Sequence, residues 1–223
     1  MNKILIIGGS KGIGKASADY FSSLDYDVTT MARTNADILG DITQQKVRDT
    51  LVESSRPDIV LVCAGMLSDN IVETMEVNYV AASDLISKFY YSLDNGAMII
   101  NLSSVAAMLS QGRAAMTPRR IAYNTSKNAI SNFCISLSRS KLRDVRVCTI
   151  EPEIVVPTDF SDFCKKPINP GNYENYDFDK FTPLGPSDII SAIEWIIGQP
   201  RWVNVCRITI NNHFSHLQTS ALR

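Results

Sequence analysis

An apolar strand that runs directly into a glycine-rich loop is the feature that most constrains the fold of this chain. The stretch KILII, Lys3–Ile7, reads as a buried strand, and GGSKGIG follows before a helical pattern that ends near residue 23. Gly8, Gly12 and Gly14 have the spacing Gly-x-x-x-Gly-x-Gly. Such a loop lets the backbone approach a pyrophosphate, and the following helix offers it free N–H groups. The stretch predicts a dinucleotide site, with a simple tight turn as the alternative.

Apolar, β-branched runs alternate with helical patterns along the rest of the chain. The runs that read as strands are YDVTTMAR, ADILGDI, DIVLVCAG, AMIINLSS, VRVCTIEP and NVCRITI. Helical patterns cover about residues 43–54, a long region ending near 93, about 121–142 and about 186–197. Continuous apolar strands separated by helices predict a parallel sheet covered on both faces. We therefore expect a single doubly wound, Rossmann-like α/β domain over residues 1–223, with about seven mostly parallel strands.

Composition and charge exclude several classes of function. The 223 residues are 45% hydrophobic, and the formal net charge of -1 gives no argument for a nucleic-acid or membrane partner. No apolar run approaches the roughly 18 residues of a membrane span, and the first apolar stretch is too short for a signal peptide. The five cysteines form no CxxC pair and have no histidine at metal-ligand spacing. They read as reduced thiols of a cytoplasmic protein without a metal site.

One long irregular stretch, about residues 152–185, interrupts the alternation. A loop of this length in a compact domain is usually functional or mobile, and we expect it to be the substrate loop. Its aromatic side chains are candidates for an apolar lid, although some could simply anchor the loop: Phe160, Phe163, Tyr173, Tyr176, Phe178 and Phe181.

A phenol and an ammonium stand four positions apart in the stretch AYNTSKNAI. On a helix, Tyr123 and Lys127 would lie on one face. A positive charge beside a phenol favours the phenolate, and moves a group that titrates near roughly 10 towards working pH. The pair could serve acid–base chemistry, or it could be two surface residues.

With GGSKGIG, NLSS and YNTSK in this order, the chain resembles the short-chain dehydrogenase/reductase family, of the short single-domain type. The resemblance covers about residues 2–142, and it implies a catalytic set of Ser104, Tyr123, Lys127 and Asn78. Tyr123 would exchange a proton with the carbonyl or alcohol oxygen, and Ser104 would hydrogen-bond that oxygen. Lys127 would lower the pKa of the phenol and hold the nicotinamide ribose, while Asn78 would support a water chain. Taken alone, Ser104 could be a capping serine and Asn78 could cap or bend a helix.

The resemblance also implies a cofactor-binding set. Ile13 would pack under the glycine loop, and Asp41 with Ile42 looks like the pair that flanks the adenine ring. The expected set is Gly8, Ser10, Lys11, Gly12, Ile13, Gly14, Arg33, Thr34, Asp41, Ile42, Ala64, Gly65, Tyr123, Lys127, Pro152 and Val155.

The end of the second strand, TTMARTNAD, bears on which cofactor is used. An NAD-preferring fold usually has Asp or Glu there, but this chain has Ala32 and then Arg33, with no acid until Asp37. A guanidinium grips phosphate through paired donors, and Lys11 could add a second positive charge. We expect NADP(H) to be preferred, with NAD(H) possible. The alternative is that Arg33 points to solvent.

These features predict an NADP(H)-dependent oxidoreductase that interconverts a ketone or aldehyde and an alcohol. An epimerase or dehydratase of the same family type is an alternative, which the short chain disfavours. A non-catalytic NADP-binding regulatory protein is another, which the intact Ser104, Tyr123 and Lys127 disfavour. The resemblance further implies a homodimer or homotetramer in which the helix of about residues 121–142 lies in an isologous interface.

The sequence departs from the family pattern near the expected site. Cys63 replaces a usual asparagine, and Glu153 stands where glycine is usual, which restricts the backbone and brings a carboxylate near the nicotinamide end. Arg113, Arg119 and Arg120 precede Tyr123. They could meet an anionic substrate or carrier, or form a solvated basic loop.

Overall fold

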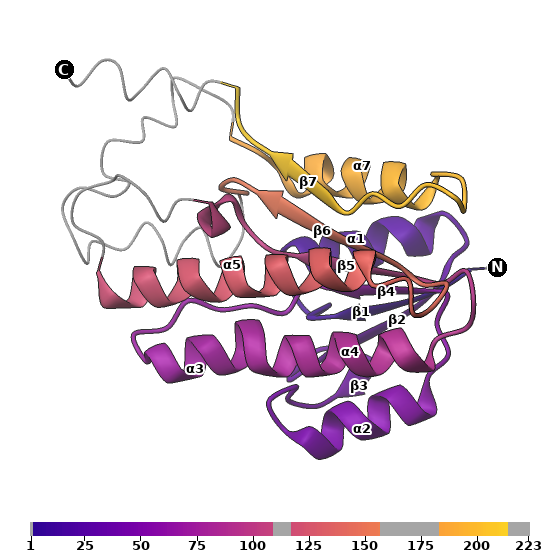
Figure 1. The fold of residues 1–223 in the computed structure, drawn as a ribbon, viewed down its shortest axis with the longest axis horizontal. Helices are drawn as coiled ribbons and strands as arrows, with labels where there is room; N and C mark the ends of the chain where they lie inside the picture. Colours follow the sequence, from indigo (N-terminus) through magenta and orange to yellow (C-terminus); the bar gives the residue numbers. More distant parts are fainter. Residues whose placement is uncertain (1, 109–116, 157–182, 214–223) are drawn as a thin grey trace.

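The computed structural model describes residues 2–108, 117–156 and 183–213, and its strands form one sheet in the order β3-β2-β1-β4-β5-β6-β7 (Figure 1). All neighbouring strands pair in parallel. The strands are β1 Lys3–Ile7, β2 Asp27–Ala32, β3 Ile38–Leu39, β4 Ile59–Val62, β5 Met98–Leu102, β6 Arg146–Pro152 and β7 Arg207–Ile210. The predicted doubly wound α/β fold with about seven strands is confirmed, and the pairing is wholly rather than mostly parallel.

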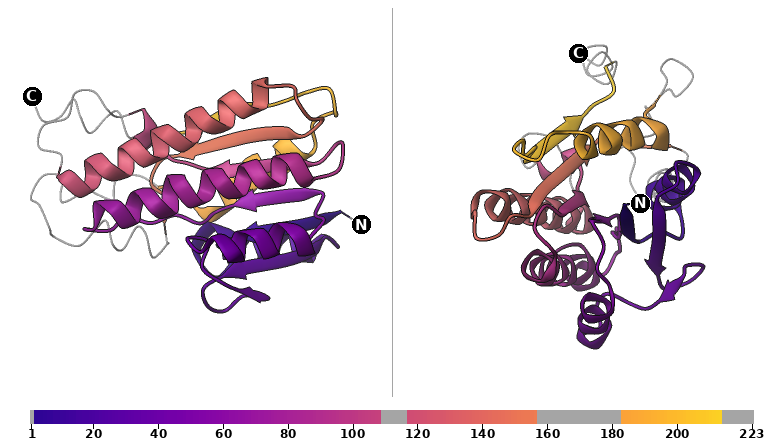
Figure 2. Two further views of the ribbon diagram at one scale, coloured as in Figure 1. Left: turned by 60° about the horizontal axis from the view of Figure 1, so that its bottom comes forward. Right: turned by 90° about the vertical axis from the view of Figure 1, so that its right-hand side faces the viewer.

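Helices cover both faces of the sheet (Figure 2). The helical elements are α1 Gly12–Ser23, α2 Gln45–Ser54, α3 Ile71–Met75, the π-helix η1 Glu76–Ala81, α4 Ala82–Ser92, the 3-10 helix η2 Val105–Ala107, α5 Pro118–Arg139 and α7 Pro186–Ile197. Helices α2, α4 and α5 pack on one face, and α1 and α7 pack on the other. The helical region expected to end near residue 93 is thus three consecutive elements, α3, η1 and α4.

Two apolar layers hold the sheet between its helices. Phe89 and Leu85 of α4 are fully buried on one face, and Phe21 of α1 and Ile189 of α7 are buried on the other. Residues of β1 alternate between the two layers, since Leu5 belongs to the first and its neighbours to the second. A strand buried on both faces needs apolar residues at every position, which is why these strands read as continuous hydrophobic runs.

The order of the strands reverses direction between β1 and β4. The chain leaves β1 towards β2 on one side and continues from β4 towards β5 on the other. In doubly wound sheets, ligands bind at this switch point, outside the carboxyl ends of the strands. Those ends point to the side of the molecule where α3 and α5 begin (Figure 1).

The two ends of the expected substrate loop meet beside β6. Val155 bridges to Leu184, and the Val156 N–H donates to the Leu184 carbonyl oxygen at 2.8 Å. The aromatic residues proposed as a lid lie between these ends, outside the described residues.

Candidate active site

The glycine loop between β1 and α1 forms a cradle that side chains would fill. Gly8 has φ +86° and Gly12 has φ +56°, in the left-handed region that favours glycine. A Cβ at Gly8 would lie 2.7 Å from the Ala64 nitrogen, and a Cβ at Gly14 would collide with the Gly8 carbonyl oxygen. The loops after β1 and β4 therefore touch, backbone against backbone, at the switch point.

Helix α1 begins at this cradle and offers its first turn to an anion. Its N-cap residue, Lys11, has extended backbone and makes no side-chain cap. The N–H groups of a helix's first turn attract negative charge when no side chain caps them. Ser10, Lys11 and Ile13 belong to the same loop and first turn as the three glycines. That this segment binds a pyrophosphate stays a prediction.

Gly9 is a residue of this loop that the sequence reasoning missed. A Cβ there would lie 2.8 Å from the Thr30 side chain on β2. The loop therefore packs tightly on β2 as well as on the loop after β4. The adjacent glycines Gly8 and Gly9 were the signal in the sequence that could have indicated this close contact.

The phenol and the ammonium lie together on α5 and are both buried. Tyr123 is 7% exposed and Lys127 6% exposed, and the Lys127 Nζ lies 5.9 Å from the centre of the Tyr123 ring. The Lys127 Nζ donates to the Leu102 carbonyl oxygen at 3.0 Å. A Cβ at Gly65 would lie 3.0 Å from that Nζ, so glycine makes room for the ammonium. The alternative of two surface residues is wrong.

Burial determines the charge state of Lys127. Desolvation lowers its pKa from 10.5 to about 8, against the opposing effect of the Cys63 and Cys134 thiols. Burial raises the pKa of Cys63 to about 12, with Lys127 acting to lower it, so Cys63 stays a neutral thiol. The cysteine that replaces the usual asparagine therefore puts no charge beside Lys127.

We expect cofactor affinity to follow the titration of Lys127. Because its pKa is about 8 in the folded protein, the ammonium is present below that pH and is lost as the pH rises through it. NADPH affinity should fall by about tenfold between pH 7 and pH 9, the scale of one weakened charge-assisted hydrogen bond, when measured by calorimetry. Lys127→Arg, which keeps its charge throughout, should flatten the profile. A wild-type profile as flat as that of the variant would contradict the role of the lysine.

The same shift has a consequence for stability. The unfolded chain binds more protons than the folded chain between pH 8 and the ordinary lysine value of 10.5. The contribution of Lys127 to the free energy of unfolding therefore rises with pH across that window.

Ser104 follows β5 and caps the short helix η2. Its Oγ accepts from the Ala106 N–H at 3.1 Å and donates to the Pro152 carbonyl oxygen at 3.5 Å. Ser104 is therefore a capping serine, as the alternative interpretation held. It also lies beside Pro152, a predicted cofactor residue. Helix η2 is in turn joined to α5, because Asn128 donates to the Ala107 carbonyl oxygen at 2.7 Å.

Two serines that the sequence reasoning missed lock β5 to α5. The Ser103 Oγ donates to the Lys127 carbonyl oxygen at 3.0 Å and accepts from the Ser131 Oγ at 2.7 Å. Both serines are buried. They fix the height of the Tyr123–Lys127 turn above the sheet, and only the first serine of NLSS could have signalled this.

Asn78 lies in the π-helix η1 and holds the loop after β4 against α5. Its Oδ1 accepts from the Met66 N–H at 2.8 Å, and its Nδ2 donates to the Met66 carbonyl oxygen at 2.8 Å and to the Ser126 Oγ at 3.0 Å. π-Helical turns are frequent at functional sites. Asn78 thus positions the backbone next to Gly65, while its support of a water chain stays a prediction.

The expected adenine end of the site is held by a buried arginine. Asp41 accepts from the Thr43 N–H and hydroxyl at 2.9 and 2.8 Å, and Ile42 is buried. Arg48 of α2 donates to the carbonyl oxygens of Ile42 and Thr43 and to the Asp84 carboxylate. Sequence reasoning missed Arg48, although an arginine on the buried face of α2 was a signal.

Arg33 and Thr34 are exposed just beyond β2, at the same edge of the sheet as the glycine loop. Among the described residues, no carboxylate pairs with Arg33. The guanidinium is therefore available for a ligand.

The departures near β6 are accommodated locally. The Glu153 N–H donates to the Ile210 carbonyl oxygen, and its carboxylate accepts from the Asn212 N–H at 2.8 Å. Glu153 does not take the left-handed conformation that glycine would ease. Arg119 pairs with Asp69 at 3.1 Å, so it is not simply a solvated cation, and Arg113 lies outside the described residues.

In the part of the chain that the structure describes, no helix is both long and apolar enough to cross a membrane. The same residues contain no group of three side chains arranged to bind a metal ion.

The fold and the site define a nucleotide-binding protein of the short-chain dehydrogenase/reductase class. The model of the NAD-dependent epimerase/dehydratase family matches residues 4–157, and the chain belongs to that family. The resemblance noted in the sequence is thereby confirmed, and the family supports an oxidoreductase of this type. No curated protein matches the sequence.

Solved structures share the fold over nearly the whole chain. A short-chain dehydrogenase family protein from Francisella tularensis is 21% identical, with a TM-score of 0.79 over 97% of this chain and 99% of its own. The 3-alpha-hydroxysteroid dehydrogenase from Pseudomonas sp. B-0831, complexed with NADH, is 20% identical, with a TM-score of 0.80 over 98% of both chains. A short-chain dehydrogenase from Burkholderia cenocepacia, in complex with NADP, is 20% identical, with a TM-score of 0.77 over 94% and 96%.

Proposed function

We propose that the chain is an NADP(H)-dependent oxidoreductase that interconverts a ketone or aldehyde and an alcohol. The observation that carries the proposal is the buried pair on α5, with the Lys127 ammonium 5.9 Å from the ring centre of Tyr123. Burying an ammonium costs free energy, and a buried lysine beside a phenol suits acid–base chemistry better than it suits stability. Lys127 lies against Gly65, in the loop after β4, which is one of the two strands that flank the switch point. This fold class binds its ligands at that point.

The glycine cradle and the buried pair fit a dinucleotide. Gly8, Gly12 and Gly14 would leave room for the pyrophosphate, and Lys127 would hold the ribose next to the nicotinamide. When bound, the nicotinamide supplies or accepts the hydride. Tyr123 would give a proton to the carbonyl oxygen or take it from the alcohol, and Ser104 would donate a hydrogen bond to the same oxygen. The Ser104 hydroxyl can turn to do so, because its bond to Pro152 is long at 3.5 Å.

The preference for NADP(H) is supported by Arg33 and Lys11. Both are exposed at the edge of the sheet where the second strand ends. Two of the similar solved structures are complexes with NADH and with NADP, respectively. These complexes therefore do not decide between the cofactors. An unpaired guanidinium beyond β2 suits the 2′-phosphate.

Replacing Arg33 with alanine should weaken NADPH selectively. The free energy of NADPH binding should become less favourable by about 1.5–3 kcal/mol, because a hydrogen bond to a charged group is lost, while NADH binding changes little. Calorimetric titration of wild type and variant with both cofactors measures this. Equal losses for both cofactors, or a wild-type protein that prefers NADH, would refute the preference.

Two other functions are distinguished by simple assays. The family name includes epimerases and dehydratases, which would leave the cofactor unchanged after a full turnover. A regulatory NADP-binding protein would bind the cofactor without turnover. Incubation with NADPH and a panel of ketones and aldehydes, followed at the nicotinamide absorbance, tests the proposed function. Binding without any oxidation of NADPH would favour the regulatory alternative.

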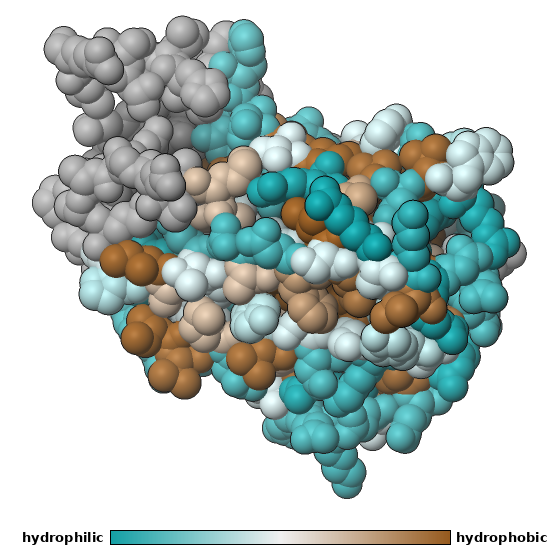
Figure 3. Space-filling view, viewed as in Figure 1, coloured by the Kyte–Doolittle hydropathy of each residue, from teal (hydrophilic) through white to brown (hydrophobic). Residues whose placement is uncertain are grey.

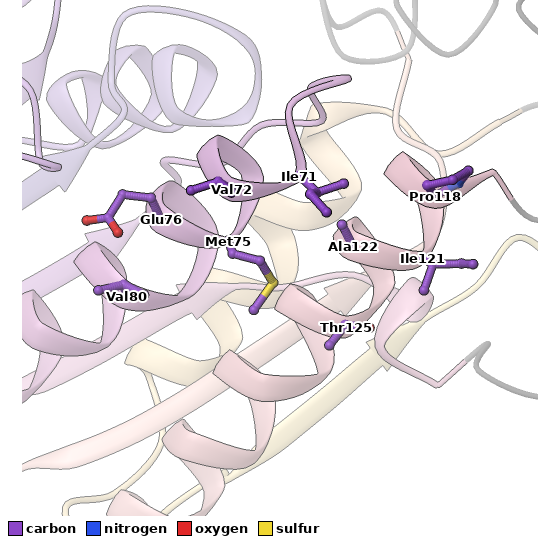
Figure 4. A pocket seen from close by; sticks show the side chains of 9 residues that line it. All are labelled: Ile71, Val72, Met75, Glu76, Val80, Pro118, Ile121, Ala122 and Thr125. Atoms are coloured by element: carbon purple, nitrogen blue, oxygen red, sulfur yellow. The ribbon is translucent and has the colours of Figure 1, made fainter.

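We also propose that the chain assembles with itself through α5. An apolar groove of about 560 Å³ lies between α3 and α5, on the side of α5 away from the sheet (Figure 4). Apolar side chains gather there on the surface (Figure 3), and Val72 is 71% and Ile121 51% exposed. A second copy of the chain, packed about a two-fold axis, would cover both.

Val72→Asp should convert the assembly to monomers. Burying an unpaired carboxylate in an apolar interface costs several kcal/mol. Light scattering at micromolar concentration measures the mass, and Leu39→Asp, at an exposed position on edge strand β3, is the matched control that should leave it unchanged. A monomeric wild-type protein would rule out the assembly.

The proposed location is the cytoplasm. Cys63, Cys134, Cys148 and Cys206 are free thiols in the structure, which supports a reducing compartment. The location itself stays a prediction.

A further inference from the structure

Asp37 and Thr30 form a closed hydrogen-bonded clamp at the edge of the sheet. The Asp37 Oδ2 accepts from the Thr30 N–H at 2.8 Å and from the Thr30 hydroxyl at 2.7 Å. The Asp37 N–H donates back to the Thr30 hydroxyl oxygen at 3.0 Å. The carboxylate thus occupies the place of a ladder partner on β2, one residue before β2 and β3 begin to pair.

The clamp closes the loop that carries Arg33 and Thr34. Residues 33–36 connect the end of β2 with Asp37, and Asn35 in this loop has φ +52°. A second bond, from the Gly40 N–H to the Ala32 carbonyl oxygen, joins the strands beyond the loop. The loop is therefore a short turn whose two ends are held together by hydrogen bonds. These bonds determine where the exposed donors Arg33 and Thr34 lie.

The same threonine also supports the glycine loop. A Cβ at Gly9 would lie 2.8 Å from both the Cβ and the Cγ2 of Thr30. The methyl side of Thr30 thus packs on the loop that carries Ser10 and Lys11, while its hydroxyl holds Asp37. One side chain connects the two segments from which phosphate donors are expected.

We propose that Asp37 and Thr30 are positioning residues for cofactor selectivity, which set the loop of Arg33 and Thr34 against the glycine loop so that both reach the 2′-phosphate. The inference rests on the proposed function, since it needs a nicotinamide dinucleotide at the switch point between β1 and β4. It also assigns a role to the first acid after β2 that differs from binding the ribose hydroxyls. In this role Asp37 fixes the position of the loop and does not contact the cofactor. Its carboxylate accepts hydrogen bonds from Thr30 instead.

The Thr30 hydrogen bonds lower the pKa of Asp37, so the carboxylate is charged at neutral pH. A charged acid near the ribose could instead accept hydrogen bonds from the ribose hydroxyls, as in NAD-preferring folds. The two roles make opposite predictions for Asp37→Asn. Both Thr30 bonds end on one oxygen, which an amide oxygen can replace, so a positioning role survives this change. A ribose-reading role would be lost, and NADPH would then bind more tightly.

The test is equilibrium binding of NADPH and NADH, without substrate, to the full chain and four variants. Asp37→Ala and Thr30→Val, which break the clamp, should each raise the Kd for NADPH about tenfold and that for NADH less than about twofold. Asp37→Asn keeps both the clamp and the methyl contact, and it should stay within about threefold of wild type for both cofactors. Thr30→Ser keeps the hydroxyl bonds but removes the methyl group that packs on Gly9, so its Kd for NADPH should lie between those of wild type and Thr30→Val. Thermal unfolding of each variant checks that the fold is retained, and Thr30→Val, which leaves Asp37 in place, carries the test if Asp37→Ala does not fold.

The results separate the inference from the function on which it rests. A wild-type protein that binds neither cofactor overturns the proposed function before any variant is made. Equal losses of NADPH and NADH affinity in the clamp-breaking variants overturn the positioning role alone. Tighter NADPH and weaker NADH binding by Asp37→Asn would identify a ribose-reading acid, and would also overturn it.

Discussion

Replacing Tyr123 with phenylalanine should lower kcat about 10²–10⁴-fold, the usual contribution of a positioned general acid. The Kd for NADPH should stay within about twofold, because the hydroxyl is removed while the buried ring keeps its packing. The ring is 7% exposed and lies against the Lys127 ammonium, so the substitution leaves the shape of the site intact. Single-turnover kinetics and cofactor titration of the same preparation measure the two effects.

Tyr91→Phe is the matched control for that experiment. Tyr91 is 54% exposed on α4 and belongs to no part of the candidate site, so turnover should not change. Near-normal turnover in Tyr123→Phe would show that the phenol takes no part in the mechanism. The proposed reason for burying Lys127 beside it would then be wrong as well.

Replacing Gly14 with alanine should abolish most cofactor binding. A Cβ at this position would collide with the carbonyl oxygen of Gly8. The backbone fixes the positions of both atoms, so neither can rotate away. Either the first turn of α1 or the loop after β1 must move, which costs about 1–3 kcal/mol of stability. NADPH affinity should fall about 100-fold, the effect of losing roughly two hydrogen bonds between backbone N–H groups and a charged pyrophosphate.

Gly198→Ala provides the control for backbone strain. Gly198 lies at the end of α7 with φ -70°, and the nearest atom to an added Cβ is 3.5 Å away. Urea unfolding should show a change within about 0.5 kcal/mol, with unchanged cofactor affinity. Unaltered NADPH binding by a folded Gly14→Ala variant would contradict the cradle.

The sequence predicts the elements whose signals are local. The bounds of β1 and α1 agree with expectation, because an apolar run, a glycine loop and an amphipathic helix follow one another without a gap. The π-helix η1 was not predicted, since one widened turn changes hydrophobic periodicity too little to be seen. Strand β3 has only two residues, although ADILGDI suggested more, because pairing with β2 extends only over Met31 and Ala32.

The site shows the same division between local and long-range information. That Tyr123 and Lys127 share a helix face follows from their spacing, but their burial depends on Gly65 and Leu102, which are distant in the sequence. Arg48 also acts through partners on other elements. Such long-range contacts leave no periodic pattern in the sequence, so they become visible only in the folded structure.

The most direct test of the account uses NADPH deuterated at the transferable position of the nicotinamide ring. With the best carbonyl substrate from the panel, the alcohol formed should carry one deuterium at the former carbonyl carbon, and one NADP⁺ should appear per alcohol. Mass spectrometry of the product measures this. An unlabelled product, a product formed with the cofactor unchanged, or no reduction of any carbonyl would contradict the central claim.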